Sequence, residues 1–414
     1  MCGGMVEFED IFPTVILILG GVIIFSILLR AGLNRIGIPS LVGFLILGLL
    51  LRVGDDHWSF LSEEVGGIFD FLATVGVVFL LFRVGLESNL AGLRRQLKPA
   101  SVIWAGNIFF SGFLGYVAAY FLLGLEQIPS LFVAVALTAT SVAISVGVWQ
   151  EAKATQSRVG EVLVDVAEMD DISAMVLMAL LFSVVPLLRE GAEASLGVAL
   201  AKELGFLLLK TAAFGTVCVI FSRYLEHRLT SLFKRIEPAP GQTLMVAGAG
   251  LIIAALAGLL GFSVAIGAFF AGLVFSRDPE AVKVDTPFGL LYEFFTPFFF
   301  IGIGLNIDPG SLASGLGIGG VLLGVAVLGK VVGTAGPAIV PIGWTGALLL
   351  SVSMVPRAEI AMVIMQRGLN QGDWAVPADV FSGMVLVTAV TAIVTPIVLR
   401  RMLRRWPQQA DAAT

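Results

Sequence analysis

About thirteen apolar stretches, each long enough to cross a lipid bilayer as a helix of roughly 20 residues, occupy almost the whole chain. Their centres lie near Val22, Leu45, Val77, Phe110, Val135, Met175, Ala212, Gly250, Phe269, Phe298, Gly324, Met354 and Ala392. Hydrophobic residues make up 57% of the chain and charged residues 13%, whereas roughly 25% of the residues in a soluble domain are charged. A chain this apolar needs lipid as its solvent, so we expect an all-α polytopic membrane protein.

Basic residues are concentrated after the odd-numbered stretches, at 30–35, 94–98, 153–158, 223–235, 277–283 and 400–405. Loops with an excess of Lys and Arg stay in the cytoplasm. We therefore expect a cell-membrane protein with its N-terminus outside and its C-terminus in the cytoplasm, which an odd number of spans also requires. Residues 1–405 are expected to form one transmembrane domain, followed by a short tail over 406–414 and no soluble regulatory domain.

Two pairs of similar segments indicate an internal repeat. Residues 43–48 resemble residues 267–272, with glycine at both ends, and residues 82–86 resemble residues 301–305, with glycine fourth. The copies lie an odd number of spans apart, which gives them opposite topology, and inverted repeats are typical of secondary transporters. We predict a first repeat over about 12–188, a linker helix over about 200–224 and a second repeat over about 240–403.

The sixth stretch carries five acidic residues, at a cost that membrane proteins accept mainly at functional positions. They are Glu161, Asp165, Glu168, Asp170 and Asp171. At the rise of an α-helix, Asp171 lies roughly 17 Å beyond Gly160, near the bilayer midplane. Asp165, Glu168 and Asp171 share one side of the helix because they are spaced by three. We therefore predict an acidic funnel from the cytoplasm that ends at a paired carboxylate.

The eleventh stretch carries one charge, Lys330, at a depth of about 20 Å. A lone ammonium at the midplane needs a carboxylate partner. Asp170 and Asp171 supply one partner for Lys330 and leave one carboxylate free, and this free carboxylate is the main indication of function. The structural alternative is that Lys330 only neutralises the acidic pair.

Two stretches are expected to break near the membrane centre. Pro356 lacks a backbone N–H and interrupts one of them, and Arg357 and Glu359 follow it, where we expect them to pair with each other or with the funnel carboxylates. The other break is expected at hydroxyl residues of matching depth, namely Thr138, Thr140 and Ser141. Two broken helices at corresponding positions are typical of a transporter site, because their ends direct backbone dipoles at an ion.

These features in order resemble the monovalent cation:proton antiporter superfamily, in its Kef- and NapA-like sodium/proton exchanger branch. The matching motifs lie at 42–48, 81–87, 138–143, 170–171, 330 and 356–359, within a region from about Ile38 to Thr395. The resemblance implies crossed broken helices in a moving core made of the fourth to sixth and eleventh to thirteenth spans, and a static panel that dimerises. It also implies that Asp171 binds the ion while Asp170 pairs with Lys330.

The paired aspartates and the lysine resemble electrogenic sodium/proton members, whereas Kef-type potassium members have a Gln-Asp pattern. Glu168 and Met169, directly before the pair, depart from the family pattern and affect what can be inferred about selectivity. The resemblance implies a homodimer that exchanges Na⁺ for protons by alternating access and serves pH homeostasis. K⁺/H⁺ exchange of the Kef type is the alternative, as is a cation or pH sensor on the same scaffold.

Other classes of protein fit the sequence poorly. An intramembrane aspartyl protease needs carboxylates that meet across helices, whereas Asp170 and Asp171 are adjacent on one helix. A passive channel favours repeated polar rings over one site between broken helices. The two cysteines, Cys2 and Cys218, form no metal-ligand cluster, and no nucleotide fingerprint is present. We therefore expect no enzymatic activity, no cofactor and no nucleic-acid partner; the expected partners are the transported ions, the lipid bilayer and a second copy of the chain.

Overall fold

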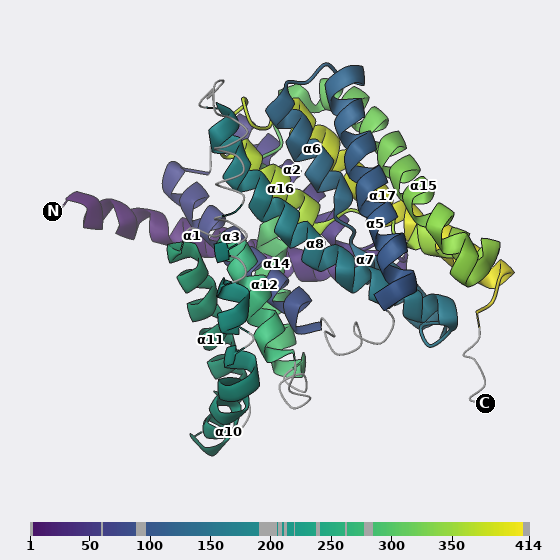
Figure 1. The fold of residues 1–414 in the computed structure, drawn as a ribbon. Coiled ribbons are helices and arrows are strands. Elements are labelled where there is room, and N and C mark those ends of the chain that lie inside the picture. Colours follow the sequence, from purple (N-terminus) through teal and green to yellow (C-terminus); the bar gives the residue numbers. More distant parts are fainter. Residues whose placement is uncertain are drawn as a thin grey trace.

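The computed structural model describes residues 3–58, 61–87, 97–189, 205, 209–210, 213–218, 220–236, 241–260, 263–276 and 285–408. Every regular element within these ranges is a helix (Figure 1). Several sequence predictions lie outside them: Ala212, much of the linker helix over 200–224, most of the basic segment 94–98, all of 277–283, and residues 409–414 of the tail.

The first half of the described chain contains α1 (Gly3–Arg35), α2 (Ser40–Trp58), α3 (Glu63–Glu87), α5 (Leu97–Val117), η1 (Ala118–Leu122), α6 (Gln127–Thr138), α7 (Val142–Glu151) and α8 (Arg158–Arg189). The second half contains η2 (Phe221–Leu225), α10 (Glu226–Ile236), α11 (Gly241–Leu259), α12 (Val264–Phe275), α14 (Asp285–Leu305), η3 (Pro309–Ser311), α15 (Leu312–Ser353), α16 (Glu359–Leu369) and α17 (Ala378–Arg405).

The described residues include 7 helices long and apolar enough to cross a membrane, and further apolar helices of 10–17 residues. The expectation of an all-α polytopic membrane protein is therefore confirmed. All but two of the predicted centres lie within helices; Ala212 is outside the described residues and Met354 lies at a break. The eleventh span and the start of the twelfth are two helices within α15, separated by a break at Gly343, whose φ is 70°. Glycine adopts this left-handed conformation without the cost that a Cβ imposes.

The described helices pack into two groups. The core group consists of α5, α6, α7, α8, α15, α16 and α17, where α15 packs on both α5 and α17. The panel group consists of α1, α2, α3, α11, α12 and α14, in which α3 packs on α12 and α14, and α2 packs on α14. In Figure 1, α11 and α12 lie below and to the left of α5, α15 and α17. The core group has the membership that the family resemblance implied.

Glycine contacts hold the panel helices close together. A Cβ on Gly48 would lie 2.1 Å from the carbonyl oxygen of Ile301, and a Cβ on Gly85 would lie 2.2 Å from that of Phe269. Small residues allow such close backbone approach between membrane helices. Gly48 in turn lies against Gly304, and Gly85 against Gly272. Exchanging α2 with α12 and α3 with α14 converts one contact into the other, as an internal repeat requires.

Candidate functional site

The two predicted breaks meet in the middle of the core group. α6 ends at Thr138 and α7 begins at Val142, while α15 ends at Ser353 and α16 begins at Glu359. The backbone N–H of Ser141, in the first break, donates a 2.8 Å hydrogen bond to the carbonyl of Pro356, in the second. The crossed broken helices expected from the sequence are therefore present, and each break supplies a backbone partner for the other.

A buried tryptophan stabilises the place where the two broken helices cross. The indole Nε1 of Trp149, a fully buried residue on α7, donates to Ser353 Oγ at 2.9 Å. Ser145 Oγ, one turn earlier, donates to the Ser353 carbonyl at 2.7 Å. These bonds join α7 to the last turn of α15, so two half-helices far apart in sequence are held as one unit. The sequence analysis did not identify Trp149 or Ser145.

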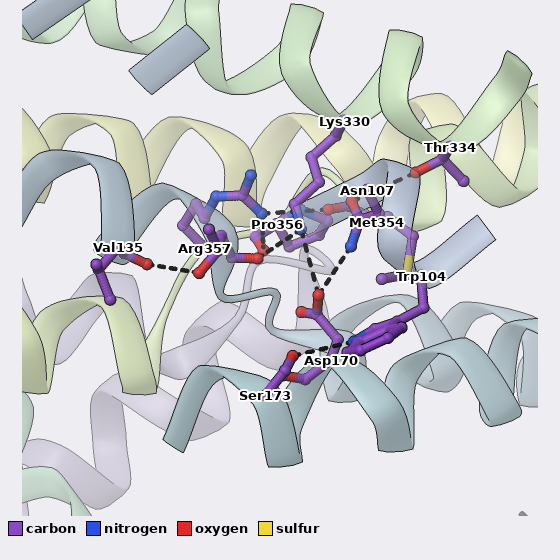
Figure 2. Close-up of polar contacts among 11 residues, drawn as sticks. Trp104, Asn107, Val135, Asp170, Ser173, Lys330, Thr334, Met354, Pro356 and Arg357 are labelled. Atoms are coloured by element: carbon purple, nitrogen blue, oxygen red, sulfur yellow. Dashed lines mark hydrogen bonds and ion pairs between the residues drawn. The ribbon is translucent and has the colours of Figure 1, made fainter. Parts of the chain in front are cut away.

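The charged centre of the site is an ion pair between α8 and α15 (Figure 2). Lys330 Nζ lies 3.6 Å from Asp170 Oδ1, and the side chains are 0% and 1% exposed. Asn107 Nδ2, from α5, donates to the same carboxylate oxygen at 2.8 Å. The predicted pairing of Lys330 with the first aspartate is therefore present in the structure. A buried ion pair is retained only with good additional hydrogen bonds, and Asn107 supplies one of them.

Lys330 also binds the end of a half-helix. Its ammonium group donates a 2.6 Å hydrogen bond to the carbonyl of Thr138, the last residue of α6. The carbonyl end of a helix carries partial negative charge, which a cation stabilises. Lys330 therefore connects the Asp170 carboxylate with the α6 terminus.

Arg357 occupies the equivalent position at the other break. It is fully buried, and its Nη1 donates to the carbonyls of Met354 at 3.2 Å and Pro356 at 3.5 Å. Within the described residues, its Nε and Nη2 make no hydrogen bond. The carbonyls exposed where α15 ends therefore bind one side of the guanidinium, and its pairing with Glu359 or a funnel carboxylate stays a prediction. Its backbone N–H donates to Thr391 Oγ1 on α17 at 3.1 Å.

The acidic residues of α8 divide into two sets. Asp165, Glu168 and Asp171 are half-buried, Glu161 is exposed, and Asp170 is buried. This agrees with the helical spacing, which places Asp170 about 100° from Asp171 around the axis. One face of α8 therefore carries the partly exposed carboxylates, while Asp170 points into the core of the site.

Hydroxyl groups at the first break have different environments. Thr138 Oγ1 donates to the Val135 carbonyl at 2.7 Å, within its own helix, so Thr138 serves the site through its backbone carbonyl. Thr140 Oγ1, Ser141 Oγ and Asp170 Oδ2 are buried oxygens without a hydrogen-bond partner among the described residues. Buried polar atoms in native proteins normally have partners, and oxygens are the ligands that hard cations prefer.

Asn107 is the main site residue that the sequence analysis missed. Besides its bond to Asp170, its Oδ1 accepts a 3.4 Å hydrogen bond from Thr334, one turn beyond Lys330 on α15 (Figure 2). On the neighbouring turn of α5, Trp104 Nε1 donates to Ser173 Oγ at 3.1 Å. An amide in the otherwise apolar stretch around Phe110 was the available signal.

Glu359 is half-buried at the first turn of α16 and lines a cavity of about 510 Å³ together with Arg30 and Glu293. Arg30 and Glu293 form a bidentate ion pair between α1 and α14, with both N–O distances 3.1 Å. Glu359 therefore faces the boundary between the core group and the panel group.

Comparison with known proteins assigns the chain to a protein family. Residues 21–405 match the family described as sodium/hydrogen exchanger, transmembrane. The chain is 29% identical to a Na⁺/H⁺ antiporter of Enterococcus hirae over 374 residues, covering 90% of this chain and 94% of the relative. It is 28% identical to the Na⁺/H⁺-K⁺ antiporter GerN of Bacillus cereus over 400 residues, covering 95% and 96%.

A solved structure has the same fold. The sodium proton antiporter MjNhaP1 from Methanocaldococcus jannaschii superimposes with a TM-score of 0.66 over 95% of this chain and 97% of its own, at 16% sequence identity. The match of the family over nearly the whole chain, together with this fold, shows a transporter rather than an enzyme. The chain belongs to the sodium/hydrogen exchanger family of transmembrane cation:proton antiporters.

Proposed function

We propose that the protein exchanges Na⁺ for protons by alternating access, with the paired aspartates of α8 as its ion site. The observation that carries this proposal is the buried Asp170–Lys330 ion pair beside the two crossed breaks. Lys330 neutralises Asp170, and Asp171 is the next residue, half-buried at the inner end of the acidic face of α8. Asp171 is the proposed cation ligand, assisted by Asp170, Thr140 and Ser141.

Competition at these carboxylates couples the two fluxes. A carboxylate that holds a proton no longer attracts Na⁺, and one that holds Na⁺ no longer binds a proton. The site is therefore loaded by one or the other, and each crossing carries only one kind of cargo. Asp165 and Glu168, on the same face of α8, are proposed to draw cations toward Asp171.

Movement of the core group against the panel group would carry the site from one side to the other. A charged site is costly to move past an apolar surface, so the core moves at low cost only when proton or cation has neutralised it. The hydrogen bonds from Trp149 and Ser145 to Ser353 favour motion of the crossing as one body. Arg357 and Lys330 stabilise the ends of the two half-helices.

Na⁺ is the proposed physiological cation. The relative from Enterococcus hirae is named for Na⁺ and H⁺, while GerN is named for both Na⁺ and K⁺ and the KhtU relative of Bacillus subtilis for K⁺ and H⁺. K⁺/H⁺ exchange is therefore the second candidate. A sensor on the same scaffold would bind a cation and move none.

Several features complete the proposal. In this proposal the chain lies in the cell membrane as a homodimer, with its N-terminus outside and its C-terminus in the cytoplasm. Its exchange activity contributes to pH homeostasis. The two inverted repeats over about 12–188 and 240–403 supply the two broken helices. Ion gradients drive the exchange, so the proposed mechanism uses no cofactor and no nucleic-acid partner.

Proton flux in proteoliposomes tests this function. Vesicles with an imposed pH gradient receive Na⁺, Li⁺ or K⁺ in turn, with wild type, Asp171→Asn and, for comparison on the same helix face, Asp165→Asn. We expect Na⁺ and Li⁺ to dissipate the gradient with wild type, to do so only at higher concentration with Asp165→Asn because less cation is drawn to the site, and to give no response with Asp171→Asn. A response to K⁺ alone would transfer the mechanism to potassium exchange, and no response to any cation would contradict transport by this protein.

A further inference from the structure

A second cavity lies between the core group and the panel group, away from the acidic face of α8. It has a volume of about 340 Å³ and is lined by α3, α12 and α14 of the panel and by α16 of the core. Asp70, on α3, and Arg367, on α16, both line it. The two charges of this cavity therefore belong to the two groups that are proposed to move against each other.

Contacts along α8 indicate on which side of the membrane this cavity opens. The Arg367 guanidinium lies 5.1 Å from the ring centroid of Phe182 on α8. Phe182 lies twenty-one residues beyond Glu161 on this continuous helix, a rise of about 32 Å, which equals the thickness of the hydrocarbon core. The cavity therefore opens on the opposite side of the membrane from the Glu161 end of the acidic face.

The proposed ion path has two openings, called mouths: the first at the Glu161 end of the acidic face of α8, and the second at this cavity. The two mouths differ in charge. The Glu161 end carries Glu161, Asp165 and Glu168 on one helix face. The other mouth carries one carboxylate and one guanidinium. Asp70 is exposed on α3, and its backbone carbonyl accepts a 2.8 Å hydrogen bond from the Thr74 hydroxyl. Phe182 holds Arg367 on the core side of the cavity.

We infer that Arg367 and Asp70 set the apparent affinity for the transported cation at this second mouth, in opposite directions. The positive charge of Arg367 lowers the local cation concentration, which favours release, and Asp70 counters it. This inference rests on the proposed function, because it concerns the release path of the same ion. Neither residue contacts the Asp170–Lys330 centre, so both are positioning charges rather than ligands.

The expected effect is a shift in KM at one face of the membrane. One unit of charge at a hydrated mouth changes the local cation concentration by roughly two- to five-fold. Arg367→Gln should therefore lower the KM for Na⁺ by about this factor at the second mouth, and Asp70→Asn should raise it. The double variant should return to the wild-type value, and Arg367→Lys should keep it.

Right-side-out and everted membrane vesicles measure KM at each face separately. The matched control is Arg189→Gln, because Arg189 also stacks on an aromatic ring, that of Trp374 at 4.1 Å, near the same end of α8 but outside the cavity lining. We expect little change of KM with this control. Raising the ionic strength with choline chloride should shrink the Arg367→Gln shift, since salt screens exposed charges.

Three results would overturn the inference. They are an equal KM shift at both faces, shifts of the same sign from Arg367→Gln and Asp70→Asn, and no shift at either face with active protein. In each case wild type still exchanges Na⁺ for protons, so the proposed function stands while the role of the second mouth fails. Wild-type vesicles that move no cation would instead refute both.

Discussion

Removing Lys330 should destabilise the protein far more than removing an exposed basic residue. Lys330 Nζ lies 3.6 Å from Asp170 Oδ1 with both side chains buried. At an effective dielectric constant of about 20, two unit charges at this separation attract by about 4–5 kcal/mol. Loss of one partner of a buried pair leaves an uncompensated charge and costs about 3–5 kcal/mol. We therefore expect Lys330→Met to lower the free energy of unfolding by about 3–5 kcal/mol.

A double-mutant cycle separates the pair from its surroundings. Asp170→Asn keeps the shape of the side chain and an oxygen for the Asn107 donor, and removes the charge that Lys330→Met would leave unpaired. The double variant should therefore be more stable than Lys330→Met alone, with a strongly non-additive coupling energy. Arg400→Met is the control, because its ion pair with Glu151 is 35% and 61% exposed and such pairs contribute at most about 1 kcal/mol.

Thermal unfolding of the purified protein in detergent, followed by tryptophan fluorescence, provides the comparison. The structure predicts that Lys330→Met lowers Tm well below the Arg400→Met value and that the double variant recovers much of the loss. Additive effects of Lys330→Met and Asp170→Asn would show that the two side chains do not form a coupled buried pair.

Three further predictions concern the scaffold and use the same unfolding assay. Trp149→Phe removes the hydrogen bond to Ser353 while keeping most of the ring, so stability should fall by about 1 kcal/mol; an unchanged Tm would show that this bond is not needed. Asn107→Ala removes a charge-assisted donor to the buried carboxylate and should cost about 1.5–3 kcal/mol; a more stable variant would contradict its role. Gly85→Ala places a Cβ 2.2 Å from a panel carbonyl and should lower the free energy of unfolding by about 1–3 kcal/mol. In Gly20→Ala the added Cβ meets nothing within 4 Å, so stability should not fall. Equal Tm values for the two variants would refute the close packing of the panel.

Features that depend on local chemistry could be predicted from the sequence. Pro356 removes a donor, so the break beside it follows from its covalent structure. Lys330 needed a carboxylate because an unpaired charge in a membrane is costly, and the adjacent aspartates were near the same depth. The assignment of the pair to Asp170 came from the family resemblance, and the 3.6 Å distance agrees with it.

Features that depend on long-range packing could not be predicted. The lysine contact with the Thr138 carbonyl and the arginine contacts with Met354 and Pro356 involve backbone atoms, which carry no sequence signal. In the sequence, only the charge of Arg357 indicated a partner, so a carboxylate was expected and these backbone carbonyls were not.

The heat of Na⁺ binding to the purified protein tests the central claim, competition between cation and proton for Asp171, most directly. If cation and proton compete for Asp171, then Na⁺ binding must release protons into the buffer. Isothermal titration of wild type in two buffers with different ionisation enthalpies should therefore give different heats, and Asp171→Asn should show no Na⁺-dependent heat in either. Equal heats in both buffers, or Na⁺ binding by Asp171→Asn as tight as that of wild type, would contradict competition at this carboxylate.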